Sequence, residues 1–281
     1  MPAFTEPKFS SIWPDGIQCT VLLTFDVDGP SSWINKDPNY ANLPSLMSMA
    51  NYGPQIATPR ILEILEHYNI QSTFFIPGFV AETNQTLVRD IANKGHEVGH
   101  HGFMHEPPAT LTEEQEHDVL HQGMDIIASI TGERPIGYRS PSWELSTSSI
   151  DLLINHKFKY DSSMMGHDRL YSVPNSDLSN SIVEIPIHWL LDDAPHFVYA
   201  PSAGRLGPLK TANQVYETWK SEFDGIYKYG GCFNLTMHPQ HIGRPGRLLM
   251  LEKLIHYIKS FDKVQFMTCE QVAKQYLQLN S

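Results

Sequence analysis

The sequence has few cysteines and no long apolar run. Its 281 residues include three cysteines, Cys19, Cys232 and Cys269, which lie far apart. An odd number of scattered cysteines argues against a disulfide framework, so we expect buried free thiols, as in a reducing cytoplasm. No apolar run approaches the roughly 18 residues that a membrane span requires, which argues against a membrane protein.

Basic clusters and the marks of an export signal are lacking as well. The formal net charge is −11 and no group of Lys and Arg residues stands out, which argues against nucleic-acid binding. The first residues, MPAFTEPKFSSIWPDG, have no basic start followed by an apolar stretch, so we expect no secretory signal. The composition therefore predicts a cytoplasmic protein without nucleic-acid or membrane partners.

What the sequence does contain is a regular alternation of strand-like and helix-like segments. Thr58 is expected to cap the helix that begins TPRILEILEHY, with Pro59 as its first residue. A capping box, Thr112 with Gln115, predicts a helix that stops near Gly132. Two more amphipathic helices are expected near 211–231 and 247–261. Strands are expected at 19–25, 72–76, 97–100, 136–139, 157–160, 182–187, 232–236 and 264–267.

This alternation predicts an α/β fold with parallel strands, either an open sheet or a closed barrel. No linker or repeat divides the chain, so residues 1–281 are expected to form a single domain. Segments 29–57 and 188–209 are expected to be long and irregular. Loops of that length in a compact domain are usually lids or walls of a site.

Two acidic residues follow the first expected strand. The sequence TFDVDGPSSW places Asp26 and Asp28 directly before Gly29. Side chains two apart in a strand point the same way, so both carboxylates face one side at the end of the strand where α/β proteins build their sites. One of them could simply cap the turn at Gly29. The pair nevertheless favours a functional site, because unpaired buried carboxylates are costly.

A histidine pair follows the third expected strand, in GHEVGHHGFMHEPP. His101 and His105 are four residues apart. This spacing lets two imidazoles reach one metal ion if the segment is helical or tightly turned. The spacing alone is weak evidence, because both residues are common and the separation is short.

Four of the other histidines have simpler interpretations. His96 and His100 are expected to be packed or hydrogen-bonded inside the protein. His117 and His121 share the four-residue spacing, but they lie among acidic residues in an expected helix. We interpret them as part of a solvated helix face.

An arginine and a further histidine also stand at strand ends. Arg139 ends an expected strand in GYRSPSWELS, and Trp143 follows in a turn. His238 follows the strand 232–236 and precedes Pro239. Taken singly, Arg139 could form only a structural ion pair and His238 could be a surface residue. Together with the acid pair and the histidine pair, they lie on the same rim of an α/β barrel.

These four groups resemble the motifs of the polysaccharide deacetylase (NodB-like) superfamily, also called carbohydrate esterase family 4. TFDVDG is similar to the first motif, TFDDG, and HHGFMH to the second, H-[ST]-x-x-H. RSPSW is similar to the third, and LTMHP to the last, which supplies a histidine. The resemblance spans about residues 19–272 and implies a distorted (β/α)7 barrel.

The resemblance implies a divalent metal on an Asp-His-His triad, here Asp28, His101 and His105. The metal is usually Zn²⁺, with Co²⁺, Mn²⁺ or Ni²⁺ as alternatives. Such a site leaves positions open for water and substrate, which suits amide hydrolysis.

The resemblance also assigns proton-transfer roles. Asp26 would be the base that deprotonates water, and Arg139 would orient it. His238 would be the acid that protonates the leaving nitrogen.

An aspartate near a tryptophan tethers this histidine in the family. Asp193 is preferred for that role in HWLLDD, with Asp192 and Asp161 as rivals. Trp143 and Trp189 are expected to line the substrate pocket.

The sequence departs from the family pattern at two positions. Val27 separates the acids of the first motif, and Gly102 stands where Ser or Thr is usual. Both departures resemble a subgroup that contains intracellular-type peptidoglycan deacetylases, cyclic imide hydrolases and a metal-independent allantoinase. The subgroup implies a homo-oligomer such as a tetramer.

The substrate follows less directly than the reaction. Without an export signal, and with two long segments able to wall in a pocket, we favour a small amide or cyclic imide as the substrate. The alternative is N-deacetylation of peptidoglycan or another N-acetylated sugar. A remote alternative is a catalytically silent carbohydrate-binding member, but the usual mark of one is loss of Asp26 or His238, and both are present.

Overall fold

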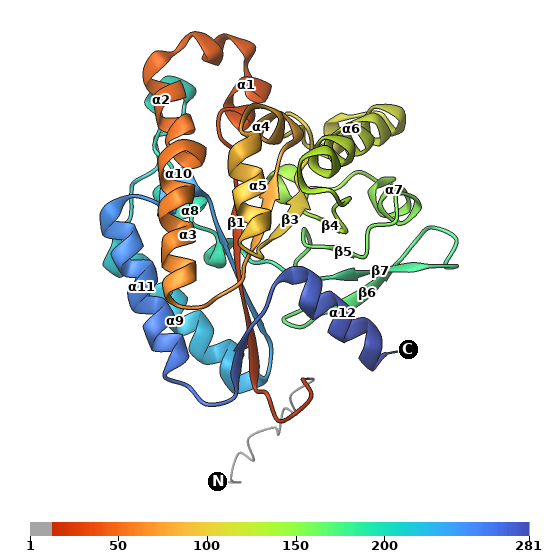
Figure 1. Ribbon diagram of the computed structural model, residues 1–281, viewed down its shortest axis with the longest axis vertical. Coiled ribbons are helices and arrows are strands. Elements are labelled where there is room, and N and C mark those ends of the chain that lie inside the picture. The colour runs from red at the N-terminus through yellow and green to blue at the C-terminus, as the bar shows by residue number, and fades with distance from the viewer. Residues whose placement is uncertain (1–12, 281) are drawn as a thin grey trace, which may run out of the picture.

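A curled sheet of largely parallel strands runs through the centre of the molecule (Figure 1). The computed structural model describes residues 13–280. The strands are β1 Cys19–Asp26, β2 Thr73–Ile76, β3 Glu97–His100, β4 Gly137–Tyr138, β5 Tyr160–Asp161, β6 Tyr171–Pro174, β7 Ser181–Glu184, β8 Cys232–Met237 and β9 Val264–Phe266.

The strand order across the sheet is β6-β7-β5-β4-β3-β2-β1-β8, and β9 pairs with the first part of β1. The β6–β7 pair is antiparallel and the remaining described pairs are parallel. Strands β7 and β8 are connected by the segment that follows β7, which contacts β8. There the Asn234 side chain donates to the carbonyl of Pro186, and Asp192 forms a bridge with Thr236. The sheet is thus a half-barrel of a single α/β domain, which confirms the predicted fold class.

Strand β1 is central because both of its faces are covered. All eight of its residues are buried. Val21 and Phe25 belong to the large core beneath the helices, whereas Leu22 packs with Phe75 and Tyr160 inside the curl. Buried strands of parallel sheets are apolar on both faces for this reason.

Some predicted strands have different bounds. The strand expected at 157–160 is β5, Tyr160–Asp161, because Lys157 has a left-handed backbone (φ 71°) and ends the preceding helix turn. The strand expected at 182–187 ends at Glu184, since Pro186 cannot donate to a ladder. Strand β6 was not predicted.

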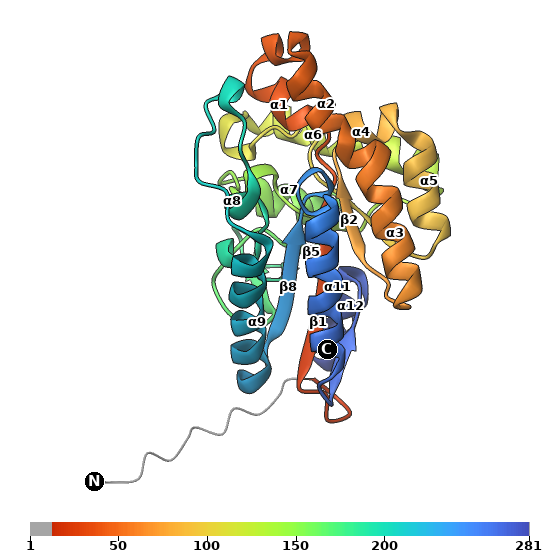
Figure 2. The ribbon, with the colours of Figure 1, turned by 90° about the vertical axis from the view of Figure 1, so that its left-hand side faces the viewer.

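Helices surround the outer face of the sheet (Figures 1 and 2). The capping box of Thr112 and Gln115 and the left-handed end at Gly132 are as predicted. None of the helices between residues 13 and 280 is long and apolar enough to cross a bilayer. The helices are α1 Ser31–Lys36, α2 Pro44–Tyr52, α3 Thr58–His67, α4 Gly78–Thr83, α5 Gln85–Asn93, α6 Glu113–Thr131, α7 Ser149–Asn155, α8 Ala194–Phe197, α9 Ala212–Tyr229, α10 Pro239–Ile242, α11 Pro245–Lys259 and α12 Cys269–Leu279.

The prediction that Thr58 caps a helix is wrong. A π-helical turn, Gly53–Ala57, joins α2 to α3, and the Thr58 hydroxyl donates to the carbonyl of Gly53 within that turn. The segment 29–57 was predicted to be irregular, but it is helical over much of its length. Pro44 lies in the first turn of α2, where proline is tolerated.

The two long segments pack on each other above the carboxyl ends of the strands (Figure 2). A small apolar cluster joins them, with Trp33 and Leu46 from the first and Ala200 and Ala203 from the second. The second segment contains α8 and two single turns of 3₁₀ helix. This mutual packing holds both segments over the site.

The three cysteines are buried free thiols, as predicted.

Candidate active site

Asp26 and Asp28 stand where β1 leaves the sheet. Asp26 is the last residue of β1, and the amide of Val27 still donates to Phe75 of β2. The main-chain carbonyl of Asp28 accepts from the amide and hydroxyl of Ser31 at 3.1 and 2.6 Å, which forms the turn into α1. The backbone of Asp28, rather than its carboxylate, therefore caps the turn.

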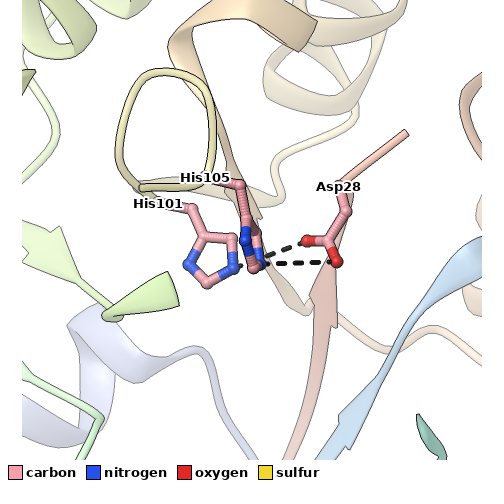
Figure 3. Close-up of side chains that lie close together, drawn as sticks. All are labelled: Asp28, His101 and His105. Atoms are coloured by element: carbon pink, nitrogen blue, oxygen red, sulfur yellow. Dashed lines mark ion pairs between the residues drawn. The ribbon is translucent and has the colours of Figure 1, made fainter. Parts of the chain in front are cut away.

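Three expected metal ligands converge beside this turn, and we call them the candidate metal centre: Asp28, His101 and His105 (Figure 3). Their ligand atoms lie within 4.8 Å of one another. The Nε2 atoms of His101 and His105 are 3.5 and 3.6 Å from the two carboxylate oxygens of Asp28. These separations exceed a normal hydrogen bond and leave room for an ion between the groups.

The histidine pair is brought together by a tight turn rather than a helix. Gly102 and His105 both have left-handed backbones, with φ of 70° and 65°. A Cβ atom on residue 102 would lie 2.9 Å from the Pro141 side chain. Both observations explain why glycine occupies the position where the family usually has Ser or Thr.

Hydrogen bonding orients the ligand nitrogens. His101 Nδ1 lies 2.7 Å from the carbonyl of Arg139, which only accepts, so Nδ1 carries the proton and Nε2 presents a lone pair. The Asn35 side chain donates to the carbonyl of His105 at 3.1 Å and fixes the second ligand against α1. Burial lowers the pKa of His105 to about 4, although Asp28 opposes this, so the imidazole is neutral.

The residues present fit a divalent metal. Asp28 Oδ1 is buried and has no hydrogen-bond partner among residues 13–280. Burial favours the neutral acid, but the surrounding imidazoles outweigh it and hold the pKa of Asp28 well below its usual range. A buried carboxylate with an orphaned oxygen, facing two imidazole lone pairs, is typical of a two-histidine, one-carboxylate site.

Asp26 is paired with Arg139. Arg139 Nη1 donates to Asp26 Oδ1 at 2.8 Å and to the Thr24 hydroxyl at 2.9 Å. The arginine is fully buried, its Nε donates to the carbonyl of Ser162, and its guanidinium lies 4.2 Å over the ring of Phe75. The guanidinium is therefore fixed in place and holds Asp26 in one orientation.

His238 is tethered by Asp193. His238 Nδ1 lies 2.7 Å from Asp193 Oδ1, which also accepts from the His238 amide at 3.0 Å. Asp192 is more distant, at 3.5 Å. Asp161 instead accepts a hydrogen bond from Ser163 at the end of β5. Of the three predicted tethers, Asp193 makes the contact.

The surrounding aspartates set the charge of the imidazole. Burial disfavours the charged form, but Asp28, Asp193 and Asp192 outweigh it and hold the pKa of His238 well above its usual range. Its Nε2 lies 3.7 Å from Asp28 Oδ2, so the free edge of the ring faces the candidate metal centre.

These groups open into one cavity of about 580 Å³. Trp143 and Trp189 form part of its wall, with ring centroids 4.5 Å apart. Both long segments contribute to the wall, so their predicted role as site walls agrees with the structure. The lining residues are Asp26, Asp28, Ser32, Trp33, Asn35, Lys36, His101, His105, Pro107, Ser142, Trp143, Trp189, Asp192, Ala194, Pro195, Val198, Arg205, His238, Gln240 and His241.

Several site residues were missed from the sequence. His241 lies one helical turn beyond His238 and lines the cavity, and burial lowers its pKa to about 4. Its spacing from His238 was the available signal. Asn35, Lys36 and Arg205 also line the cavity, but no local pattern marks them.

His96 and His100 lie as expected. His100 packs against Tyr138 and Phe158, and His96 Nδ1 accepts from the amide of Ser72. These contacts agree with the predicted packed or hydrogen-bonded roles.

Comparisons with known proteins show which family the chain belongs to. The family described as polysaccharide deacetylase matches residues 16–160. A peptidoglycan deacetylase of Helicobacter pylori is 31% identical over 279 residues, which cover 91% of this chain and 95% of that protein.

Solved structures show the same fold. A Mycobacterium smegmatis protein assigned to the polysaccharide deacetylases superimposes with a TM-score of 0.92 at 35% identity, covering 95% of this chain and 93% of that one. The PuuE allantoinase superimposes with a TM-score of 0.83 at 21% identity, over 95% and 92% of the two chains, which shows a shared fold. The chain therefore belongs to the polysaccharide deacetylase family, whose deacetylases are metal-dependent hydrolases of carbon–nitrogen bonds other than peptide bonds.

Proposed function

We propose that this protein removes the acetyl group from an N-acetylated amino sugar of the peptidoglycan type. The observation that carries the proposal is the placement of Asp26 and His238, a paired carboxylate and a tethered imidazole, in one cavity with the candidate metal centre. Its similarity to the peptidoglycan deacetylase of Helicobacter pylori over most of the chain supports the substrate class.

We propose Zn²⁺ as the ion, held by Asp28, His101 and His105. Two imidazole nitrogens and one carboxylate oxygen suit zinc, and Co²⁺, Mn²⁺ or Ni²⁺ can occupy similar sites. When bound, such an ion acts as a Lewis acid that polarises the acetyl carbonyl and lowers the pKa of water.

Side chains of the protein then accept and donate the protons of the reaction. Asp26, paired with and oriented by Arg139, accepts a proton from the water whose oxygen attacks the acetyl carbon. His238 donates a proton from Nε2 to the departing nitrogen as the C–N bond breaks. Asp193 holds the opposite edge of the ring and keeps Nε2 facing the cavity. The products are acetate and a free amine.

A small amide or cyclic imide is the second candidate substrate. The observation that favours it is the walled cavity, whose 580 Å³ lies within the range of about 300–1,000 Å³ usual for small-ligand pockets. The names of the relatives favour the sugar, so the preference for an imide drawn from the sequence is now the alternative.

A substrate panel separates the two candidates. Purified protein would be assayed with N-acetylglucosamine oligomers, N-acetylmuramic acid-containing fragments, cyclic imides and ureides. We expect acetate release from the amino sugars. Turnover of imides or ureides with no acetate release from any sugar would reject the proposal in favour of the alternative. Inactivity on the whole panel, with metal bound, would favour a silent carbohydrate-binding member.

Metal dependence has its own test. Dialysis against a chelator should abolish turnover, and Zn²⁺ should restore it. Protein purified without metal that is fully active and indifferent to chelator would reject the metal assignment.

A cytoplasmic location and a homo-oligomer such as a tetramer remain proposals that rest on the sequence. Size-exclusion chromatography with light scattering tests the assembly, and cell fractionation tests the location.

A further inference from the structure

A second group of histidines gathers on the surface, and none of its members lines the cavity. His117 and His121 lie one turn apart on α6, and His156 is the residue at the end of α7. We call these three residues the histidine trio. Their ring centroids are 4.7 Å apart for His117–His156, 6.3 Å for His117–His121 and 6.4 Å for His121–His156.

We propose that the histidine trio binds a divalent transition-metal ion of the borderline class, such as Zn²⁺ or Cu²⁺, between α6 and α7. The site is separate from the candidate metal centre and does not depend on the proposed function. Imidazole is the ligand that such ions share, and two histidines one helical turn apart are a common chelating pair.

The spacing of the rings is close to what an ion needs. With Zn–N bonds of about 2.0–2.1 Å, tetrahedral zinc holds the centroids of two imidazole rings about 5 Å apart. The His101 and His105 rings of the candidate metal centre are 5.0 Å apart. The trio is wider in two of its three pairs, the rings of His117 and His121 lie nearly parallel, and its ligand atoms do not all lie within 4.8 Å of one another. The side chains of His117 and His121 are 52% and 51% exposed and would turn toward His156 to share an ion.

His156 supplies a nitrogen that the protein itself does not use. Its Nε2 atom is buried and has no hydrogen-bond partner within residues 13–280. An unpartnered buried nitrogen is costly, and a metal ion would satisfy it. Burial and the neighbouring His117 and His121 lower the pKa of His156, so the ring is in the neutral form that binds metals.

The other two histidines each have a carboxylate near Nδ1. His117 Nδ1 lies 3.4 Å from Asp118, and His121 Nδ1 lies 3.3 Å from Asp125, which also pairs with Arg134. A carboxylate acceptor keeps the proton on Nδ1 and leaves Nε2 as the ligand atom, an arrangement frequent in zinc sites. His101 is oriented in the same way by the Arg139 carbonyl.

An ion at the trio would link α6 to the end of α7. Since the unfolded chain does not hold the three rings together, binding should favour the folded state and raise the melting temperature. Loss of the ion at the trio should leave turnover unchanged, whereas loss of the ion at the candidate metal centre removes it.

The test counts zinc ions per chain by equilibrium dialysis with metal analysis, on the full chain at neutral pH. We expect two ions for the wild type, one for Asp28→Ala, one for His121→Gln and none for the double variant. His67→Gln, at an exposed single histidine on α3, is the matched control and should keep both ions. One ion per wild-type chain, or a second ion that survives His121→Gln, would overturn the proposal.

A second variant and a second readout test whether the result for His121→Gln reflects loss of a ligand. His156→Gln should weaken the second zinc at least about tenfold without changing turnover. In the Asp28→Ala background, which lacks the ion of the candidate metal centre, His156→Gln should also remove the rise in melting temperature that zinc causes. In the Asp28→Ala background, Cu²⁺ should give an electron paramagnetic resonance spectrum with coupling to several nitrogens. Coupling unchanged after His156→Gln would show that this histidine is not a ligand.

Discussion

Two histidine pairs with the same four-residue spacing have opposite surroundings in this protein. His101 and His105 lie in a tight turn after β3 beside the buried Asp28, and both line the cavity. His117 and His121 lie on the outer face of α6, half exposed. Spacing alone determines which side chains can meet, whereas burial and neighbouring charges determine what chemistry follows.

The difference is electrostatic. An ion at the buried centre would act in a low-dielectric cavity, where its charge polarises a substrate far more strongly than in water. Asp26 and His238 are also in place there to move protons. An ion at the histidine trio would lie beside two half-exposed side chains, in contact with water. We therefore expect chemistry at the first site and only structural linkage at the second.

Removing the buried ligand Asp28 should have the largest effect, and it removes the ion from only one of the two sites. Asp28→Ala should lose the metal of the candidate metal centre and reduce kcat/KM by about 10⁴-fold, because several kcal/mol of transition-state stabilisation disappear. Metal analysis and steady-state kinetics check both effects. Full activity with one zinc fewer would mean that the catalytic ion lies elsewhere.

A substitution that spares the metal should sharpen the distinction between binding and chemistry. Asp26→Asn should retain the metal but reduce kcat by about 10³-fold, since the amide cannot accept the proton. Zinc content and kcat would be measured on the same preparation. A variant with undiminished kcat would contradict the assignment of Asp26 as the base.

The tether of His238 offers a matched pair of variants. Asp193→Asn should reduce kcat by about 10²-fold, because the imidazole loses the partner that orients and charges it. Asp192→Asn, whose carboxylate is 3.5 Å from the ring, should have a smaller effect. The pH profile of kcat provides the readout, since the acidic form of His238 should be lost at lower pH in Asp193→Asn. Equal effects of the two variants would remove the distinction between the aspartates.

The smallest expected effect is a pH dependence of folding stability, and melting experiments on either site must be compared at one pH. Burial raises the pKa of Glu97 to about 7, against hydrogen bonds from Tyr160, the Glu270 amide and Thr73. The folded state therefore holds a proton that the unfolded chain releases near pH 4.5. The stabilisation is complete below about pH 4.5 and is lost as the pH rises through about 7, an effect of at most about 3 kcal/mol.

Glu97→Gln should flatten this dependence, because the amide does not titrate. Urea unfolding at pH 5 and pH 8 measures it, with Glu66→Gln, an exposed glutamate on α3, as the control. If the wild type and Glu97→Gln lost equal stability between the two pH values, Glu97 would not be the group responsible.

Much of the fold followed from local patterns. The strand 97–100 and the helix that begins after Thr112 have the expected bounds, since burial and capping are encoded by adjacent residues. The prediction for Thr58 failed because Thr before Pro is typical of a helix start. In this protein the preceding helix instead continues through a π-helical turn into α3. The strand β6 was missed because its residues alternate in exposure without a strong apolar run.

The sequence by itself identified the acid pair, the histidine pair, Arg139 and His238 as candidate site residues, because each follows a recognisable strand. It did not identify other cavity residues, such as His241 and Arg205. Only the tertiary structure decided the partners of the candidate residues. Arg139 meets Asp26 across 113 residues, and His238 meets Asp193 across 45. Likewise, His156 joins His117 and His121 only because α7 packs beside α6. Contacts between distant segments depend on the packing of the whole chain, and no local pattern contains that information.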